Sequence, residues 1–275
     1  MKTWRRGIVL LMLAGLCVAT GSTGCGTTRQ IKKKAESQAE AQFLIAQQKF
    51  RNGDYKGAIE KYDRVRNDYP YSPYAVQADL RIADAYFKQD QYASAIEQYE
   101  AFVKLHPRHD KVPYARFRAA KAAYENMPGS PFLMPPAYER DLTKTHKATR
   151  KLKTFLDKHG DSTYTDKAET MLRKARRRLA DHELYVAEFH LDRNNPRAAS
   201  MRLKYLLNTY SGLGLDPKAL FLLAKSYLKM GESQKARTAF QELVRHHGDS
   251  KFAKRAKRHL DRHSGSSSKK TSDNG

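Results

Sequence analysis

Histidine pairs are the residues whose type and spacing could most directly support metal chemistry in this chain. His246 and His247 are adjacent, and His259 and His263 lie one helical turn apart, so each pair could reach one ion. A zinc site needs further cysteine, histidine or carboxylate ligands, and no convergent set accompanies these pairs. The sequence also contains no nucleophile motif, no phosphate-cradling glycine-rich loop and no paired-acid signature. We therefore expect no metal, no cofactor and no enzymatic activity.

The second of the two cysteines in the sequence, Cys25, has a position that points to covalent modification. Residues 1–24 begin with basic side chains, continue with an apolar run and end in small residues, which is the arrangement of an export signal. The apolar run is shorter than the roughly 20 residues that span a bilayer. Cys25 follows at once, and residues 23–25 resemble the lipobox of bacterial lipoproteins, although Ser22 stands where that motif usually has leucine. We expect cleavage before Cys25 and its acylation, with an uncleaved helical anchor as the alternative.

A repeated pattern of apolar residues predicts the elements that position any binding residues. The pattern recurs after 37 residues, from Tyr55, Ala58, Ile59, Tyr62 and Pro70 to Tyr92, Ala95, Ile96, Tyr99 and Pro107. Tetratricopeptide-like helical hairpins run near 34 residues, and each must stack on a neighbour to bury its apolar face. Between the first two helices, Gly53 is suited to end one helix and Asp54 to cap the next. Such arrays bind partners on their faces.

The rest of the chain continues the pattern with one interruption. A proline-rich insertion at 128–136 cannot be helical and delays the third unit. A long helix is predicted from 165 to 193, followed by units centred on Ala199 and Ala236, which are again 37 residues apart, and by a last helix near 251–262. We predict an all-α fold, a superhelical array of about five tetratricopeptide-like hairpins with a C-terminal capping helix.

Composition and pattern together divide the chain into five segments. They are a signal peptide (1–24), a lipidated tether (25–36), the first two repeats with the start of the third (37–128), the insertion loop with repeats three to five and the capping helix (129–263), and a disordered tail (264–275). The tail has too little apolar content to pack against the array.

The formal charge of +23 is concentrated at residues 173–178 and 251–262. In a cytosolic protein such runs would suggest nucleic acid. In an exported chain we expect no nucleic acid, and the runs either meet anionic lipid, peptidoglycan or acidic partners or are solvated helix faces. Four aromatic residues raise a similar choice between a peptide groove and the packed interface between repeat helices: Tyr86, Phe87, Tyr99 and Tyr124.

Several segments of this chain resemble one family. Residues 69–78 (YPYSPYAVQA) and 105–115 (LHPRHDKVPYA), with 138–141 and 181–189, are similar to the BamD family of outer-membrane assembly lipoproteins, also called competence lipoproteins. The likeness covers nearly the whole mature chain. A Gly-Leu-Gly turn at 212–214 departs from the family, which usually has a Tyr-Pro-type stop there.

The resemblance implies a non-enzymatic scaffold lipoprotein at the periplasmic face of the outer membrane, anchored through acylated Cys25. The N-terminal repeats would receive unfolded β-barrel proteins, and the residues we assign to that role are Tyr71, Tyr74, Gln77 and Arg81. The C-terminal repeats would dock the barrel-forming subunit BamA, beside other assembly lipoproteins.

For BamA binding we assign Arg202 and Tyr185. The guanidinium of an arginine pairs bidentately with carboxylates, although Arg202 could instead be a solvated helix-face cation. The alternative function is a periplasmic tetratricopeptide scaffold of cell-wall or division machinery.

Overall fold

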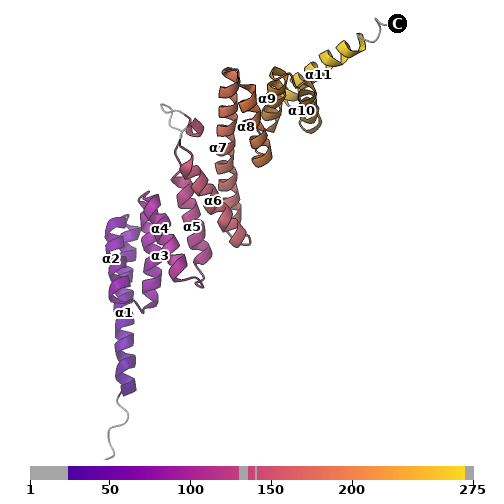
Figure 1. Cartoon of the computed structure of the whole chain (residues 1–275). Coiled ribbons are helices and arrows are strands. Elements are labelled where there is room, and N and C mark those ends of the chain that lie inside the picture. The colour runs from indigo at the N-terminus through magenta and orange to yellow at the C-terminus, as the bar shows by residue number, and fades with distance from the viewer. Residues whose placement is uncertain (1–23, 130–135, 140, 270–275) are drawn as a thin grey trace, which may run out of the picture. The chain divides into compact units, whose positions relative to one another are not determined.

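A computed structural model describes residues 24–129, 136–139 and 141–269, and every regular element in these residues is helical (Figure 1). The α-helices are α1 (Gly24–Arg51), α2 (Tyr55–Asp68), α3 (Pro73–Lys88), α4 (Tyr92–Leu105), α5 (Val112–Glu125), α6 (Thr143–Lys158), α7 (Thr165–Asp192), α8 (Pro196–Thr209), α9 (Asp216–Lys229), α10 (Ser233–His246) and α11 (Lys251–Lys269). A short 3-10 helix, η1 (Ala137–Glu139), precedes α6. Among the described residues, no helix combines the length and the apolar character that crossing a bilayer requires.

The chain divides into two compact units, of which the first ends at Ala85 within α3. In the first unit α1 packs against α2, and the ring of Phe43 lies 5.3 Å from that of Tyr62. The turn between the two helices has the predicted chemistry. Gly53 adopts a positive φ of 82°, and the Asp54 carboxylate accepts a 2.9 Å hydrogen bond from the Gly57 amide at the start of α2.

In the second unit, each helix from α4 to α10 packs against its successor in the sequence. In addition, α5 contacts α7 and α9 contacts α11, so helices of neighbouring hairpins also touch. The small residues expected where paired helices cross are buried, with exposed fractions of 0 or 1%: Ala95, Ala148, Ala199 and Ala236. Small side chains there let the helix axes approach closely.

The all-α prediction of five tetratricopeptide-like helix pairs and a last helix is confirmed by the order of the described elements. In the first unit α1 pairs with α2, and in the second unit α5 pairs with α6, α7 with α8 and α9 with α10, after which α11 follows. The long helix predicted from 165 to 193 is α7, which ends at Asp192.

Two segments expected to be irregular are helical in the structure. Helix α1 starts at Gly24 and so includes residues 25–36, which we predicted as a tether, because residues 29–41 consist mostly of strong helix formers without glycine or proline. Helix α11 runs to Lys269 and takes in residues 264–269 of the predicted tail. Extending an existing helix needs only one residue ordered for each new hydrogen bond, so weak helix formers can continue it. Residues 1–23, with most of the proposed signal peptide, and residues 130–135 of the insertion lie outside the described residues.

Candidate functional site

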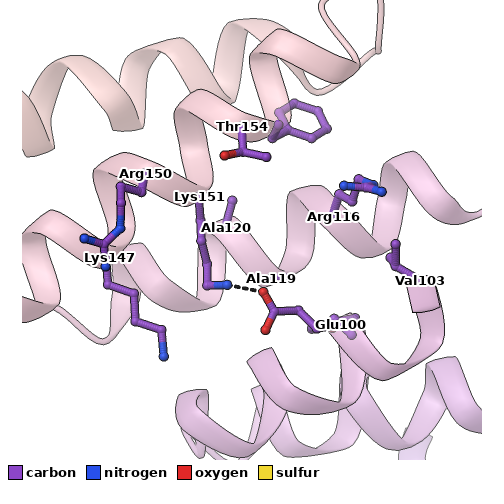
Figure 2. A pocket seen from close by; sticks show the side chains of 11 residues that line it. Glu100, Val103, Arg116, Ala119, Ala120, Lys147, Arg150, Lys151 and Thr154 are labelled. Atoms are coloured by element: carbon purple, nitrogen blue, oxygen red, sulfur yellow. Dashed lines mark hydrogen bonds and ion pairs between the residues drawn. The ribbon is translucent and has the colours of Figure 1, made fainter.

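A cavity of about 570 Å³ opens among α4, α5 and α6 (Figure 2). We call it the basic cavity; it is lined by Tyr99, Glu100, Val103, Arg116, Ala119, Ala120, Lys147, Arg150, Lys151, Thr154 and Phe155. Four of these side chains are cationic and one is acidic. Apolar atoms of Val103, Phe155 and the two alanines form much of the remaining wall.

Helical spacing explains how α6 supplies three of the cations. Arg150 and Lys151 lie three and four residues after Lys147, so the three cations lie on one side of the helix. Leu152 and Phe155 belong to the core, with exposed fractions of 0 and 1%, and Phe155 also forms part of the cavity wall. The same helix therefore holds its position by packing and presents cations to the cavity.

The cations of the basic cavity are unevenly paired. Lys151 forms an ion pair with Glu100, which links α6 to α4 and is drawn as a dashed line in Figure 2. Within the described residues, Arg116, Lys147 and Arg150 have no carboxylate partner. The cavity therefore carries an excess of positive charge that an anionic group could neutralise.

Arg116 also has an unused hydrogen-bond donor, because its Nε atom is buried and has no acceptor. His159, at the end of α6, has a buried Nε2 atom without a partner. Burial and then the positive charge of Arg116 lower the pKa of His159 below its usual value. A buried donor without an acceptor is costly, so an anion that reached Arg116 would supply a missing bond.

A second cavity, of about 580 Å³, opens among α6, α7 and α8. We call it the mixed cavity; it is lined by Asp141, Leu142, Thr143, His146, Leu179, His182, Glu183, Arg202, Tyr205 and Tyr210. Its predicted member, Arg202, donates from Nη1 to Oε2 of Glu183 at 3.2 Å. The Glu183 side chain is only 12% exposed, whereas that of Arg202 is 49% exposed. The guanidinium is thus held in place and still open to solvent.

Tyrosines complete one side of the mixed cavity. Tyr205 and Tyr210 have ring centroids 6.0 Å apart in an edge-to-face arrangement. Burial, and then the nearby Tyr205, raise the pKa of Tyr210 to about 12. At the other side, Asp141 accepts hydrogen bonds from the hydroxyl and the amide of Thr143, and these bonds lower its pKa.

The hairpin of α7 and α8 also exposes large apolar side chains. Tyr185 and Phe189 on α7 are 37 and 42% exposed, and Met201 and Tyr205 on α8 are 67 and 47% exposed. Each pair has a spacing of four residues and so lies along one side of its helix. Tyr185, which we predicted as a partner contact, does not line the mixed cavity; its ring lies 5.8 Å from that of Tyr138 in η1.

The predicted substrate residues lie in the first unit. Tyr71 is 99% exposed in the turn before α3, whereas Tyr74 is half-buried, with its ring 5.5 Å from Phe43. A hydrogen bond to Glu40 raises the pKa of Tyr74. Gln77 is exposed, and Arg81 is exposed but paired with Asp84 at 3.1 Å. Helical spacing places Tyr74, Gln77 and Arg81 in one row along α3.

The aromatic residues considered for a peptide groove mostly fill packed positions. Tyr99 is completely buried, and its hydroxyl accepts a 3.0 Å hydrogen bond from Nε of Arg118. The Arg118 guanidinium also lies 3.9 Å from the centre of the Phe87 ring, and Tyr124 packs against the core around Phe155. The packed interface between repeat helices is therefore the correct alternative for Tyr99.

Cys25 and the histidines considered for a metal lie in or directly beside helices α1, α10 and α11. Cys25 lies in α1, but its side chain is outside the described residues. In the part of the chain that the structure describes, no three histidine, cysteine, aspartate or glutamate residues gather as a metal site would require. His259 stacks on Phe240 at 5.1 Å, and the side chain of His263 is not described.

Sequence reasoning missed the basic cavity. Arg116 and the cations of α6 are separated by about thirty residues and by the insertion, so only packing brings them together. The one available signal was the spacing of Lys147, Arg150 and Lys151, which is also typical of a solvated helix face.

One family of outer membrane lipoproteins and several of its named relatives are similar to this chain. The family YfiO, described as an outer membrane lipoprotein, matches residues 35–243. The outer membrane protein assembly factor BamD of Xylella fastidiosa (strain 9a5c) is 26% identical over 237 residues, which are 84% of this chain and 80% of the relative. BamD of Vibrio cholerae is 28% identical over 222 residues, 80% of this chain and 91% of the relative.

Among solved structures, the TPR2AB domain of yeast Sti1 in complex with pHSP90 has a TM-score of 0.41 and 14% identity, covering 79% of this chain and 80% of that one. The resemblance to the BamD family inferred from the sequence is confirmed by the match to residues 35–243 and by the relatives. Since that match extends over most of the chain, the protein belongs to the YfiO family of outer membrane lipoproteins.

Proposed function

We propose that this chain is a non-enzymatic scaffold subunit of the machinery that assembles β-barrel proteins in the outer membrane. The family match over residues 35–243, with relatives named outer membrane protein assembly factors, is the observation that carries the proposal. An array of helical hairpins with open cavities suits binding, because it presents extended faces on rigid elements. The chain faces the periplasm and is held at the membrane by an acyl chain on Cys25.

The hairpin of α7 and α8 is the surface we assign to BamA. Protein interfaces combine apolar or aromatic anchors with arginine, and this hairpin exposes both kinds of side chain. Tyr185, Phe189, Met201 and Tyr205 are the anchors. Arg202 adds a guanidinium whose orientation is set by Glu183 and whose free side can pair with a carboxylate of the partner.

Unfolded barrel proteins are the ligands we assign to the first unit and to the basic cavity. The first unit offers an exposed tyrosine, Tyr71, in the turn before α3. It also offers a row of aromatic, polar and basic side chains along α3, formed by Tyr74, Gln77 and Arg81. The basic cavity provides unpaired cations beside apolar wall, which fits a carboxylate carried on an apolar segment of an extended chain. No reaction step is required of any of these residues.

Co-purification of BamA from detergent-solubilised outer membrane tests the docking surface. We expect the wild-type chain to retain BamA and Arg202→Ala to lose most of it. Lys204→Ala is the matched control, because Lys204 is an exposed cation two residues further along α8 and so points to the opposite side of the helix. Absence of any barrel protein from the wild-type pull-down would contradict the assignment to this machinery.

Photo-crosslinking tests the substrate sites separately. A crosslinker placed at Lys147 in the basic cavity, or at Gln77 on α3, should capture an unfolded barrel protein. The same crosslinker at Lys204, which lies in neither site, is the control. Equal capture at all three positions would mean that the contacts are nonspecific.

Mass spectrometry of the mature protein tests the anchor. Cleavage before Cys25 removes Trp4, the only tryptophan, so the mature chain should show no tryptophan fluorescence and should carry acyl mass on Cys25. Cys25→Ser should release the protein from the membrane fraction in a high-salt wash, which also screens attachment through exposed charges. An intact mass that still includes residues 1–24 would overturn the lipoprotein assignment.

A further inference from the structure

Helix α11 carries a dense group of positive charges, and it begins after residue 243, where the family match ends. Residues 251–262 contain six cations: Lys251, Lys254, Arg255, Lys257, Arg258 and Arg262. All six are exposed, and Asp261 is the only acidic residue among these twelve positions.

The inner side of α11 is fixed by packing. Ala253 and Ala256 are completely buried, and Phe252 and Leu260 pack against the core cluster that contains Phe221. At the helical interval of about 100° per residue, these four residues occupy one side of the helix. The six cations fall on the other side and form one continuous arc, which we call the cationic face.

The cationic face carries an excess of positive charge. Asp261 is the one carboxylate among residues 251–262, against six cations. Two of the cations contact rings: the Arg255 guanidinium lies 4.5 Å from the centre of Phe221, and the Lys251 ammonium lies 5.3 Å from that of Phe252. One acid cannot neutralise six cations, so the face remains basic.

The chemistry of this face distinguishes it from the hairpin of α7 and α8. A protein interface usually has aromatic or aliphatic anchors at its centre and is depleted in lysine. The cationic face offers three lysines and three arginines, while the apolar residues of the same segment are turned into the core. Such a face suits an extended layer of negative charge, which needs no shaped pocket and no apolar anchor.

We propose that the cationic face of α11 binds the anionic phospholipid head groups of the membrane to which the chain is anchored. The inference rests on the membrane location in the proposed function, and it adds a second attachment that the family match does not include. Electrostatic attraction between a polybasic surface and anionic lipids adds to the binding that lipid chains provide. The face would also orient the C-terminal unit toward the bilayer.

Vesicle co-sedimentation tests this with the full chain carrying Cys25→Ser, so that acylation cannot contribute. Vesicles of phosphatidylethanolamine and phosphatidylcholine are compared with vesicles that also contain phosphatidylglycerol. We expect binding only to the vesicles with phosphatidylglycerol, and weaker binding as salt is raised, because exposed charges are screened. Each cation near the surface contributes about fivefold in affinity.

The triple variant Lys254→Glu, Lys257→Glu, Arg258→Glu should lower the affinity at least on the order of 100-fold by that contribution. The matched control is Lys167→Glu, Arg173→Glu, Lys174→Glu, three exposed cations on α7 in the same unit, which should change affinity by less than about fivefold. Glutamine at positions 254, 257 and 258 gives a milder series if the reversed charges weaken folding, which circular dichroism would reveal.

Three outcomes would overturn the proposal. They are absence of binding to phosphatidylglycerol vesicles, equal loss in both triple variants, and unchanged vesicle binding in an α11 variant that instead loses an acidic protein partner. Failure here is separable from failure of the proposed function, because the α11 variant should still retain BamA in the pull-down. Loss of BamA with intact vesicle binding would contradict only the scaffold assignment.

Discussion

The basic cavity and the mixed cavity have almost the same volume, about 570 and 580 Å³, but they treat their cations differently. In the basic cavity, the one acid, Glu100, pairs with Lys151, and within the described residues Arg116, Lys147 and Arg150 form no ion pair with a carboxylate. In the mixed cavity, Glu183 already pairs with Arg202. Cavities of equal size are therefore suited to different ligands by how their charges are satisfied.

The origin of this difference lies in the helices that form the walls. Helix α5 lines the basic cavity with Ala119 and Ala120, whose small side chains leave space and offer no acceptor. Helix α7 lines the mixed cavity with Glu183, a mostly buried carboxylate that orients the arginine. The basic cavity therefore leaves hydrogen-bond donors of its cations available to a ligand. In the mixed cavity, the carboxylate of Glu183 fixes the position of one donor, the guanidinium of Arg202, before a ligand binds.

The largest expected effect is on the free energy of unfolding. Cavity-wall residues that also belong to the core should lower it much more, when replaced by alanine, than wall residues that are exposed. Phe155→Ala should lower the free energy of unfolding by about 3 to 5 kcal/mol, because this ring is 1% exposed and lies 5.6 Å from that of Phe117. Tyr205→Ala in the mixed cavity should cost about 0.5 kcal/mol or less, since the ring is 47% exposed. Urea unfolding followed by circular dichroism measures both, and similar losses would contradict the distinction.

Removing the cation of the paired cavity should have a smaller effect on stability. Arg202→Ala leaves the Glu183 carboxylate, 12% exposed, without its partner and should cost about 1 to 2 kcal/mol. Lys218→Ala breaks a more exposed pair with Glu188 and should cost about 0.5 kcal/mol or less. Adding Glu183→Gln to Arg202→Ala should restore part of the loss. Unfolding curves that rank the two single variants in the opposite order would refute this account.

The titration of His159 reports the charge excess of the basic cavity. Its pKa is lowered by burial and then by Arg116, so Arg116→Gln should raise the pKa toward the usual value without reaching it. Lys147→Gln removes another cation of the cavity that is not among the causes of the shift, and should leave the pKa nearly unchanged. NMR titration of the ring protons of His159 measures this pKa. An equal change of the pKa in both variants would show that Arg116 has no greater influence on His159 than Lys147 has.

The sign of the corresponding stability change follows from the direction of the shift. Because the folded state disfavours protonated His159, the stabilisation is complete above the unfolded pKa of about 6.5 and decreases as the pH falls below it. The decrease should end once the pH is below the lowered pKa of the folded state. In Arg116→Gln, the decrease over this acidic range should be smaller.

The smallest expected effect concerns a tyrosine of the mixed cavity. The pKa of Tyr210 is raised to about 12, so the stabilisation from its neutral form is complete below about pH 10 and is lost as the pH rises through about 12. Tyr205→Phe removes a secondary cause and should lower this pKa slightly, since burial remains. Alkaline titration of phenolate absorbance, compared with Tyr210→Phe to assign the signal, measures the change. A large fall would mean that Tyr205, and not burial, dominates.

Much of the fold was predictable because it depends on local chemistry. Gly53 and Asp54 specified one turn through backbone conformation and capping, and the alanines at 58, 95, 148, 199 and 236 marked the helix crossings. The helical state of residues 25–36 was missed because polar composition was taken as a sign of a tether, although the same residues are strong helix formers.

The candidate sites were predictable only in part. Arg202 was chosen through family resemblance, but nothing in the sequence indicated that Glu183, 19 residues earlier, would hold it. The basic cavity was missed because its cations come from α5 and α6, on either side of the insertion. Tyr185 was chosen together with Arg202, but the structure does not bring the two into one cavity. The ring of Tyr185 contacts that of Tyr138, and Tyr185 does not line the mixed cavity.

Amino-acid order alone established the helix pairs, their period and the buried small residues, because helical periodicity and capping act between residues that are near in the chain. The packed helices decided which cations keep a carboxylate partner and which remain available, because those distances join residues far apart in the chain. That division separates the orienting pair of Arg202 and Glu183 from the unpaired Arg116.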